Sequence, residues 1–306
     1  MMFLAAEHFA RAPQWQWSIL FYFFFAGLAG GTYVVSTLLR LSGDEGDEPA
    51  ARTGFYVSLV ATIVCPILLT ADLGPVSWSR FWHMLVDVTP GDTALSFKYW
   101  SPMSVGAWAL LIFGFFSFVS AFEAWASDRA GHSIVPLAVN RLFNVIGAIV
   151  GLYIASYTGV LLTVSNQPVW SDTWVLGGLF LASALSASAA SIGYLARFRR
   201  EVAFSLDRLH QADGYFSILE LVLLAVFAIT VFLAGTGGRL VPWLPLWALA
   251  VAGICASLVG ARGHIRVQAT PAEATMARAR IDTVIITLLV LIGVLALRAA
   301  VIFSGQ

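Results

Sequence analysis

The chain has 306 residues, of which 59% are hydrophobic and only 11% are charged, and its mean hydropathy is +0.84. It carries 17 basic and 17 acidic residues, and the resulting net charge of zero argues against a nucleic-acid-binding surface. Several segments exceed the roughly 18 consecutive apolar residues that mark a membrane span. We therefore predict an all-α integral membrane protein, with lipid as its main surroundings.

Apolar runs predict eight transmembrane helices joined by short polar loops. The predicted spans are 17–41, 54–71, 102–126, 139–164, 173–197, 214–235, 241–261 and 282–303. We expect them to form two four-helix bundles, one in residues 1–170 and the other in residues 171–306. No basic segment precedes the first long apolar run, so we predict no cleaved signal peptide.

The distribution of basic residues predicts the orientation of the chain. Because the number of spans is even, both termini lie on one side of the membrane. Loops on that side carry four basic residues, Arg11, Arg80, Lys98 and Arg239, whereas loops on the other side carry twelve; Arg298, near the end of the last span, is set aside. The positive-inside rule then places both termini outside, in the periplasm, for a protein of the bacterial inner (cytoplasmic) membrane.

Small residues in two spans indicate close helix packing. Gly27 and Gly31 in FAGLAGGTY have the four-residue spacing that lets a neighbouring helix approach closely. The fifth span, LASALSASAASIG, is rich in alanine and serine, and its serines have the placement to line a polar seam. Between the first two spans, the acidic run 41–52 is expected to be a solvated turn.

The segment 72–101 interrupts the apolar sequence with charged and aromatic residues. Helical spacing places one set of its residues on one face and a second set on the other: Trp78, Phe81, Trp82 and Leu85 against Arg80, His83 and Asp87. This pattern is typical of a short helix in the membrane interface. We predict that this interfacial helix, after the second span, covers the functional site.

The sequence has no motif for a redox cofactor of its own. All five histidines fall in loops or at span ends, so a membrane haem with paired axial ligands is not expected. The two cysteines lie in apolar runs, and no metal-ligand spacing, phosphate loop or catalytic triad is present. If electrons pass through this protein, their carriers belong to a ligand or a partner.

Four motifs together resemble the NrfD/PsrC family of membrane subunits of polysulfide-reductase-like molybdoenzymes. They are YFFFAGLAGGTY in span one, DLGPVSWSRFW after span two, YWSPMSVGAW opening span three and YTGVLL in span four. The resemblance implies a quinone, menaquinone or ubiquinone, bound at the outer face. It also implies a ferredoxin-like partner that carries 4Fe–4S clusters and, through it, a molybdopterin catalytic subunit.

The resemblance also nominates quinone-binding residues. Tyr157 in YTGVLL matches the family's quinone-contacting tyrosine, although an interfacial tyrosine can also be a simple membrane anchor. Gln14 and Gln16 lie at the start of span one, where the family supplies further headgroup contacts and where this chain has no histidine. Asn166, at the end of span four, is expected beside the same mouth.

Three titratable residues are candidates for proton exchange. Asp72 closes span two, where it either pins the interfacial segment through Arg80 or Lys98 or sets the protonation of the quinone site. His83 is a secondary candidate, because a histidine side chain can exchange protons near neutral pH, although a lone interfacial histidine is more often only a surface group. Glu220 lies within span six, as part of a proton route or of a hydrogen bond between helices.

We therefore predict a quinone-reactive membrane subunit of a multi-subunit oxidoreductase. Its iron–sulfur partner is expected to dock over residues 75–100, with Arg80, Trp82 and Lys98 as contact residues. Two alternatives stay open: a structural membrane anchor without a quinone site, and a transporter or ion-translocating carrier. The substrate of the complex is not encoded in this chain.

Overall fold

The computed structural model describes residues 13–42, 45–89, 91, 94–198, 203–267 and 273–306. Within these ranges the protein is helical, with one isolated antiparallel bridge. The long helices are α1 Trp17–Ser42, α2 Glu48–Asp72, α3 Pro102–Ala130, α4 Leu137–Thr163, α5 Leu176–Ala196, α6 Ala203–Leu233, α7 Leu244–Val267 and α8 Glu273–Ser304. Three short 3₁₀ helices, η1 Glu45–Asp47, η2 Trp78–Met84 and η3 Gly237–Trp243, lie in the connections.

All eight long helices are long and apolar enough to cross a membrane, which confirms the eight predicted spans. Their boundaries differ from the prediction mainly where a helix continues past its apolar run. For example, α2 begins at Glu48 rather than at residue 54, and α6 begins at Ala203 rather than at 214. Hydropathy marks only the part of a helix that lies in lipid, so it underestimates the full helix.

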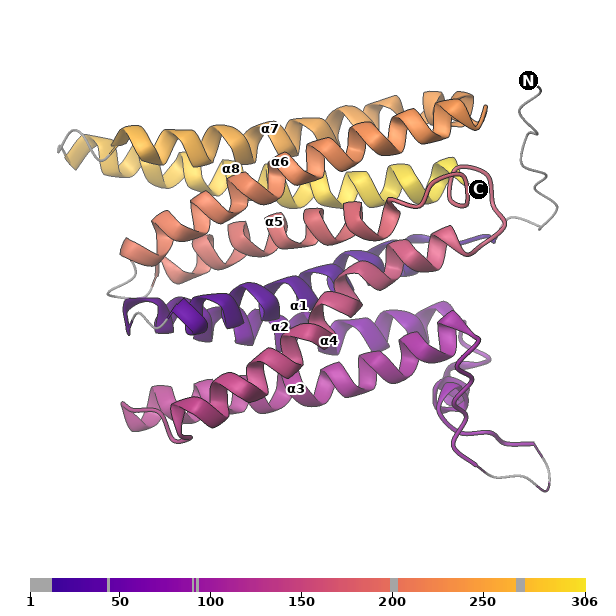
Figure 1. The fold of residues 1–306 in the computed structure, drawn as a ribbon, viewed down its shortest axis with the longest axis horizontal. Coiled ribbons are helices and arrows are strands. Elements are labelled where there is room, and N and C mark those ends of the chain that lie inside the picture. Colours follow the sequence, from indigo (N-terminus) through magenta and orange to yellow (C-terminus); the bar gives the residue numbers. More distant parts are fainter. Residues whose placement is uncertain (1–12, 43–44, 90, 92–93, 199–202, 268–272) are drawn as a thin grey trace.

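The helices run roughly parallel to one long axis, with α1 and α5 in the middle (Figure 1). The helices α2, α3 and α4 lie on the α1 side, and α6, α7 and α8 lie on the α5 side (Figure 1). Segment 73–101 and the C-terminus lie at the same end, called here the loop end (Figure 1). The 3₁₀ helix η1 and the turn 131–136 mark the opposite end. The division at residue 170 into two bundles stays a prediction.

Glycines bring α1 close to two neighbours. A Cβ on Gly31 would overlap the Ser188 hydroxyl and the Ala184 carbonyl of α5. A Cβ on Gly30 would overlap the carbonyl of Gly151 on α4. These contacts confirm the close approach predicted from the glycine spacing, and they make α1 the shared wall between α4 and α5.

Ion pairs close the opposite end of the bundle. The buried Arg40 guanidinium binds Glu48 at 2.6 Å, Glu123 at 3.0 Å and the Asn140 side chain at 3.0 Å. Asp47 is fully buried. The expectation of a solvated acidic turn was therefore wrong, because arginines from α1 and from α6 reach back to these carboxylates.

The second arginine at this end links two distant parts of the sequence. Arg208 of α6 pairs with the Asp47 carboxylate, which also accepts a 2.8 Å hydrogen bond from Ser42. The Arg208 side chain is 40% exposed, but the Asp47 carboxylate is fully buried, so loss of Arg208 would leave a buried charge without its cation. The opposite end is thus held by specific polar contacts as well as by apolar packing.

Candidate functional site

Tyr157 lies at the junction between α4 and the start of α3. Its side chain is buried, with 5% of the residue exposed, and its hydroxyl donates a 2.7 Å hydrogen bond to the carbonyl of Pro102, the first residue of α3. Gly106, one turn along α3, leaves the space that the phenol occupies, because a Cβ there would overlap the ring. Tyr153 packs beside it with a ring-centroid distance of 5.6 Å. The phenol is therefore held in one position near the loop end.

The start of α1 lies beside the C-terminal end of α8. Trp15 stacks on Trp170 with a centroid distance of 5.2 Å, and its carbonyl accepts a hydrogen bond from Gln306. The two glutamines that flank it, Gln14 and Gln16, are exposed. At the loop end, Trp15 packs against Trp170 while the two glutamines stay exposed, and Tyr157 packs against α3.

Asn166 is half-buried in the loop that joins α4 to α5. Three residues further on, Val169 has a φ of 71°, which is unusual for a β-branched residue. Its backbone N–H donates to the Asp172 carboxylate at 2.8 Å, and the hydroxyl of Thr236, in the turn after α6, donates to the same carboxylate at 2.6 Å. The loop that carries Asn166 is thus tied to the α6–α7 turn.

Segment 73–101 contains the predicted short helix after the second span, but as a 3₁₀ helix and not an α-helix. It contains the 3₁₀ helix η2 followed by a small hairpin, in which Val86 bridges to Leu95. At the hairpin, Asp87 accepts hydrogen bonds from the hydroxyl of Thr89 at 2.6 Å and from its N–H at 3.0 Å, and these bonds lower the pKa of the Asp87 carboxyl. With three residues per turn, η2 does not keep the predicted aromatic set on one face.

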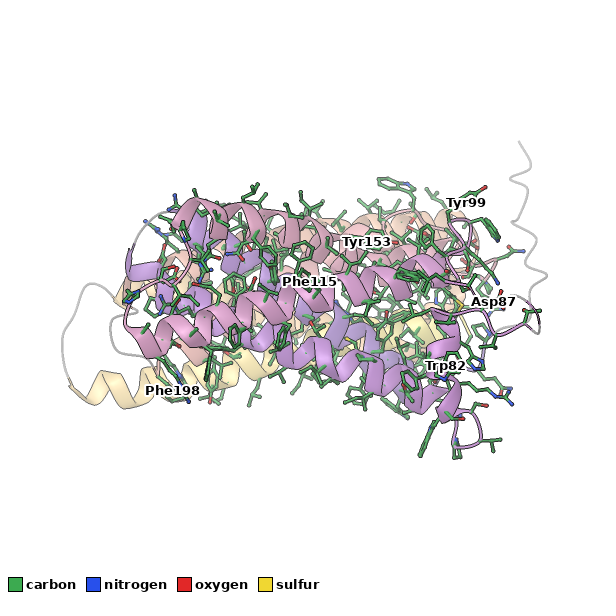
Figure 2. All side chains as sticks on the ribbon, turned by 90° about the horizontal axis from the view of Figure 1, so that it is seen from below. Trp82, Asp87, Tyr99, Phe115, Tyr153 and Phe198 are labelled. Atoms are coloured by element: carbon green, nitrogen blue, oxygen red, sulfur yellow. The ribbon has the colours of Figure 1, made fainter. Side chains whose placement is uncertain are left out.

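The three residues predicted to contact a partner, Arg80, Trp82 and Lys98, are all exposed on this segment. Trp82 packs edge-on against His83 with a centroid distance of 4.4 Å. Figure 2 shows Trp82, Asp87 and Tyr99 at one end of the molecule, beyond the helix ends. The segment thus presents aromatic and basic side chains outward from the loop end.

Asp72, at the C-terminal end of α2, binds the start of α1. Its carboxylate accepts a 2.5 Å hydrogen bond from the Ser18 hydroxyl. Among the residues that the structure describes, it forms no ion pair with the two expected partners, Arg80 and Lys98. Asp72 is exposed, so its carboxylate has access to water at the loop end.

Three buried charges lie in the α5–α8 half, and sequence reasoning singled out only Glu220. Arg298 of α8 is fully buried and donates to the carbonyl of Phe23 on α1 at 3.2 Å and to the Ser183 hydroxyl on α5 at 3.0 Å. Asp213 is 5% exposed and Glu220 is 2% exposed. The available signal was the seven-residue separation of the two acids, which places them on one face of α6. For Arg298, the available signal was a single charged residue within the apolar run LALRAAVIF, which indicates a charge inside the membrane.

No group of three or more histidine, cysteine, aspartate or glutamate side chains that could hold a metal ion occurs among the described residues. The loop end combines the buried phenol of Tyr157 with the exposed aromatic and basic side chains of segment 73–101.

Comparison with known proteins identifies the family. Residues 5–306 match the family model of polysulphide reductase, NrfD. The sequence is 24% identical to the C chain of the polysulfide reductase of Wolinella succinogenes over 239 residues, which cover 72% of this protein and 71% of that one. It is 23% identical to the C subunit of the selenate reductase of Mesobacillus selenatarsenatis over 133 residues, 42% of this protein and 28% of that one. The chain therefore belongs to the polysulphide reductase NrfD family.

Proposed function

We propose that this protein is the quinone-reactive membrane subunit of a multi-subunit oxidoreductase of the molybdoenzyme type. Its family membership supports this role, as do two relatives whose names describe each of them as one part of a reductase. The partners would be a ferredoxin-like 4Fe–4S subunit and, through it, a molybdopterin catalytic subunit. The complex would lie in a bacterial inner membrane, with the loop end outside.

The position of Tyr157 is the observation that carries the quinone assignment. A quinone site needs a hydrogen-bond donor for a carbonyl oxygen and an apolar slot for the ring. The phenol of Tyr157 is such a donor, and its hydrogen bond to Pro102 and its packing against Gly106 hold it in one position. A donor of this kind fits one carbonyl oxygen of a quinone, which would supply the two-electron, two-proton chemistry when bound.

The protein's own groups have distinct roles in this proposal. Tyr157 orients a carbonyl oxygen by donating the hydrogen that it now gives to Pro102. Gln14, Gln16 and Asn166 provide further polar contacts at the mouth. Asp72, which is exposed and bound to Ser18, exchanges protons with water at the loop end.

The exposed segment 73–101 would receive the iron–sulfur partner. Arg80 and Lys98 provide positive charge, and Trp82 provides apolar contact area. His83, half-buried beside Trp82, is a second group for proton exchange at this surface. Replacing both Arg80 and Lys98 by glutamate is expected to reduce the amount of partner that co-purifies with this protein.

Replacing Tyr157 by phenylalanine tests the quinone assignment. The variant keeps the ring but loses the donor, so we expect quinol-linked turnover of the complex to fall about tenfold while assembly is retained. Tyr153→Phe is the matched control, because Tyr153 lies one turn away and is 39% exposed. If Tyr157→Phe turns over a quinol analogue at the wild-type rate, Tyr157 is not a quinone-binding residue. A complex without bound quinone, insensitive to quinone-site inhibitors, would favour a purely structural anchor.

A further inference from the structure

A stripe of buried polar residues runs along one face of α6. Asp213, Ser217 and Glu220 follow each other at spacings of four and three residues, so their side chains lie on the same face of the helix. All three are buried, and Glu220 lies near the middle of the apolar part of α6, Arg208–Leu233. A carboxyl group in the interior of a membrane is costly, and such groups mark ion or proton pathways when they occur.

Serine hydroxyls connect this stripe to the neighbouring helices. Ser186 of α5 donates to Asp213 at 2.6 Å and lies 3.1 Å from the hydroxyl of Ser217. Ser217 in turn lies 2.6 Å from the hydroxyl of Ser257 on α7. A hydroxyl is both donor and acceptor, so a row of hydroxyls can take up a proton on one side and release one on the other.

A small cavity lies between Asp213 and the opposite end of the bundle. Its volume is about 20 Å³, and its lining includes Tyr194, His210, Asp213 and Gly260. A cavity of this size holds about one water molecule when polar groups line it. Tyr194 belongs to the last turn of α5 and His210 to the first part of α6, so the cavity lies on the side of Asp213 that faces the opposite end.

At its other end, the stripe meets Arg298. Arg298 donates to the Ser183 hydroxyl, three residues before Ser186 on the same face of α5, and to the carbonyl of Phe23 on α1. An arginine side chain stays protonated in proteins, so Arg298 provides a fixed counter-charge and does not pass on a proton itself. The helix α1 packs against α5, which carries part of this cluster, and against α4, which carries Tyr157; α4 also packs directly against α5 at Gly159.

A second buried polar row lies between α1, α3 and α4, and its chemistry is different. It runs from Arg40 through Asn140, Asn144 and Ser120 to Tyr33. Side-chain amides and a permanently charged guanidinium hold helices together but do not exchange protons readily. The carboxylates of this row are confined to the opposite end, where Arg40 pairs with them.

We infer that Asp213, Ser186, Ser217 and Glu220 form a proton path between the opposite end of the bundle and the Tyr157 side of α1. The inference rests on the proposed quinone function. Protons enter or leave at the cavity beside His210 and Asp213, pass along the serines to Glu220, and are exchanged near the loop-end site under the influence of the Arg298 charge. The same residues would thereby connect quinone chemistry at one face of the membrane with protons at the other.

The test uses the whole complex in vesicles, with a pH-sensitive dye trapped inside. A quinol analogue is added together with an oxidant that cannot cross the membrane, so that only complexes with the loop end outward turn over. Oxidation of the quinol releases two electrons to the oxidant and two protons, and the dye reports whether those protons reach the vesicle interior. We expect the wild-type interior to become acidic, and Asp213→Asn and Glu220→Gln to lose this acidification to the level of protein-free vesicles. Glu123→Gln is the control, since it neutralises a buried carboxylate outside the path.

Two comparisons keep the outcomes separate. Wild-type turnover without acidification of the interior would overturn the path but leave the proposed quinone function standing, whereas absence of quinol-linked turnover in detergent would overturn that function itself. Equal acidification in wild type and both variants would also overturn the path. If the acid variants do not assemble, Ser217→Ala removes a hydroxyl of the path without changing charge, and Ser188→Ala is its control, because Ser188 bonds only within α5. Equal acidification by these two serine variants would exclude the path.

Discussion

Replacing Gly106 by alanine is expected to displace the Tyr157 phenol without altering Tyr157 itself. An added Cβ would overlap the ring and the hydroxyl of Tyr157, and this buried side chain has no free space to move into. Overfilling a packed interior costs about 1–3 kcal/mol. The better helix propensity of alanine offsets up to about 1 kcal/mol. The net destabilisation is therefore about 0–3 kcal/mol, and the hydrogen bond to Pro102 is lost or distorted.

Gly114→Ala is the matched control on the same helix. The nearest atom to its added Cβ is a methyl carbon of Thr62 at 3.8 Å, an ordinary van der Waals distance. Gly114→Ala therefore gains the helix propensity without overfilling, and the two variants are expected to differ by about 1–3 kcal/mol.

Thermal unfolding of the assembled complex in detergent measures the stability difference, and turnover with a quinol analogue measures the effect on the site. We expect Gly106→Ala to melt at a lower temperature than Gly114→Ala and to turn over more slowly. If the two variants are equally stable and equally active, Tyr157 is not confined by α3 as described, and the reasoning from its packing is refuted.

Three further predictions concern charged residues. Arg298→Met is expected to destabilise the protein by about 1–3 kcal/mol for each buried acceptor that loses its donor, such as the carbonyls of Phe23 and Phe180; an unchanged melting temperature would contradict this role of Arg298. Arg40→Met is expected to have a similar cost, since Glu123 would stay buried without a cation, and an unchanged melting temperature would show that the pair contributes nothing. In the hairpin, the lowered pKa of Asp87 means that its stabilising effect is fully present above the ordinary aspartate pKa of about 4 and is lost as the pH falls through the lower folded value. The amide hydrogen-exchange protection of this hairpin is therefore expected to be greater in wild type than in Asp87→Asn at neutral pH. In acid, the protection of the two proteins is expected to become equal.

The sequence was sufficient for the eight spans, because a membrane requires a long apolar run for each helix and the sequence supplies eight of them. It was also sufficient for the close packing of α1, since the spacing of Gly27 and Gly31 has few other uses in a span. Helix type in short polar segments was less predictable. The segment after α2 forms η2 and a hairpin, because backbone hydrogen bonds within a short loop decide its conformation more than the spacing of its aromatic residues.

Partners of the charged residues could not be predicted, because periodicity assigns a side chain to a helix face but does not say which helix lies opposite. Asp47 pairs with Arg208, which is 161 positions away in the sequence. Asp72 binds Ser18 rather than a nearby cation, and Arg298 reaches the backbone of α1 across almost the whole sequence. Tyr157 was found as a candidate from its motif, but its partner, the carbonyl of Pro102, has no side-chain signature.

The backbone of Val169 has a consequence for how distant parts of the loop end move. A β-branched residue at a φ of 71° is strained by roughly 1–3 kcal/mol and keeps this conformation only while its surroundings hold it. The Asp172 carboxylate holds it, and the same carboxylate is bound by Thr236. A protein that binds the α6–α7 turn and pulls Thr236 away would let this strain relax, and the relaxation would reposition Asn166. Binding of a protein at the α6–α7 turn, far from Tyr157, would then change the position of Asn166 at the proposed quinone site.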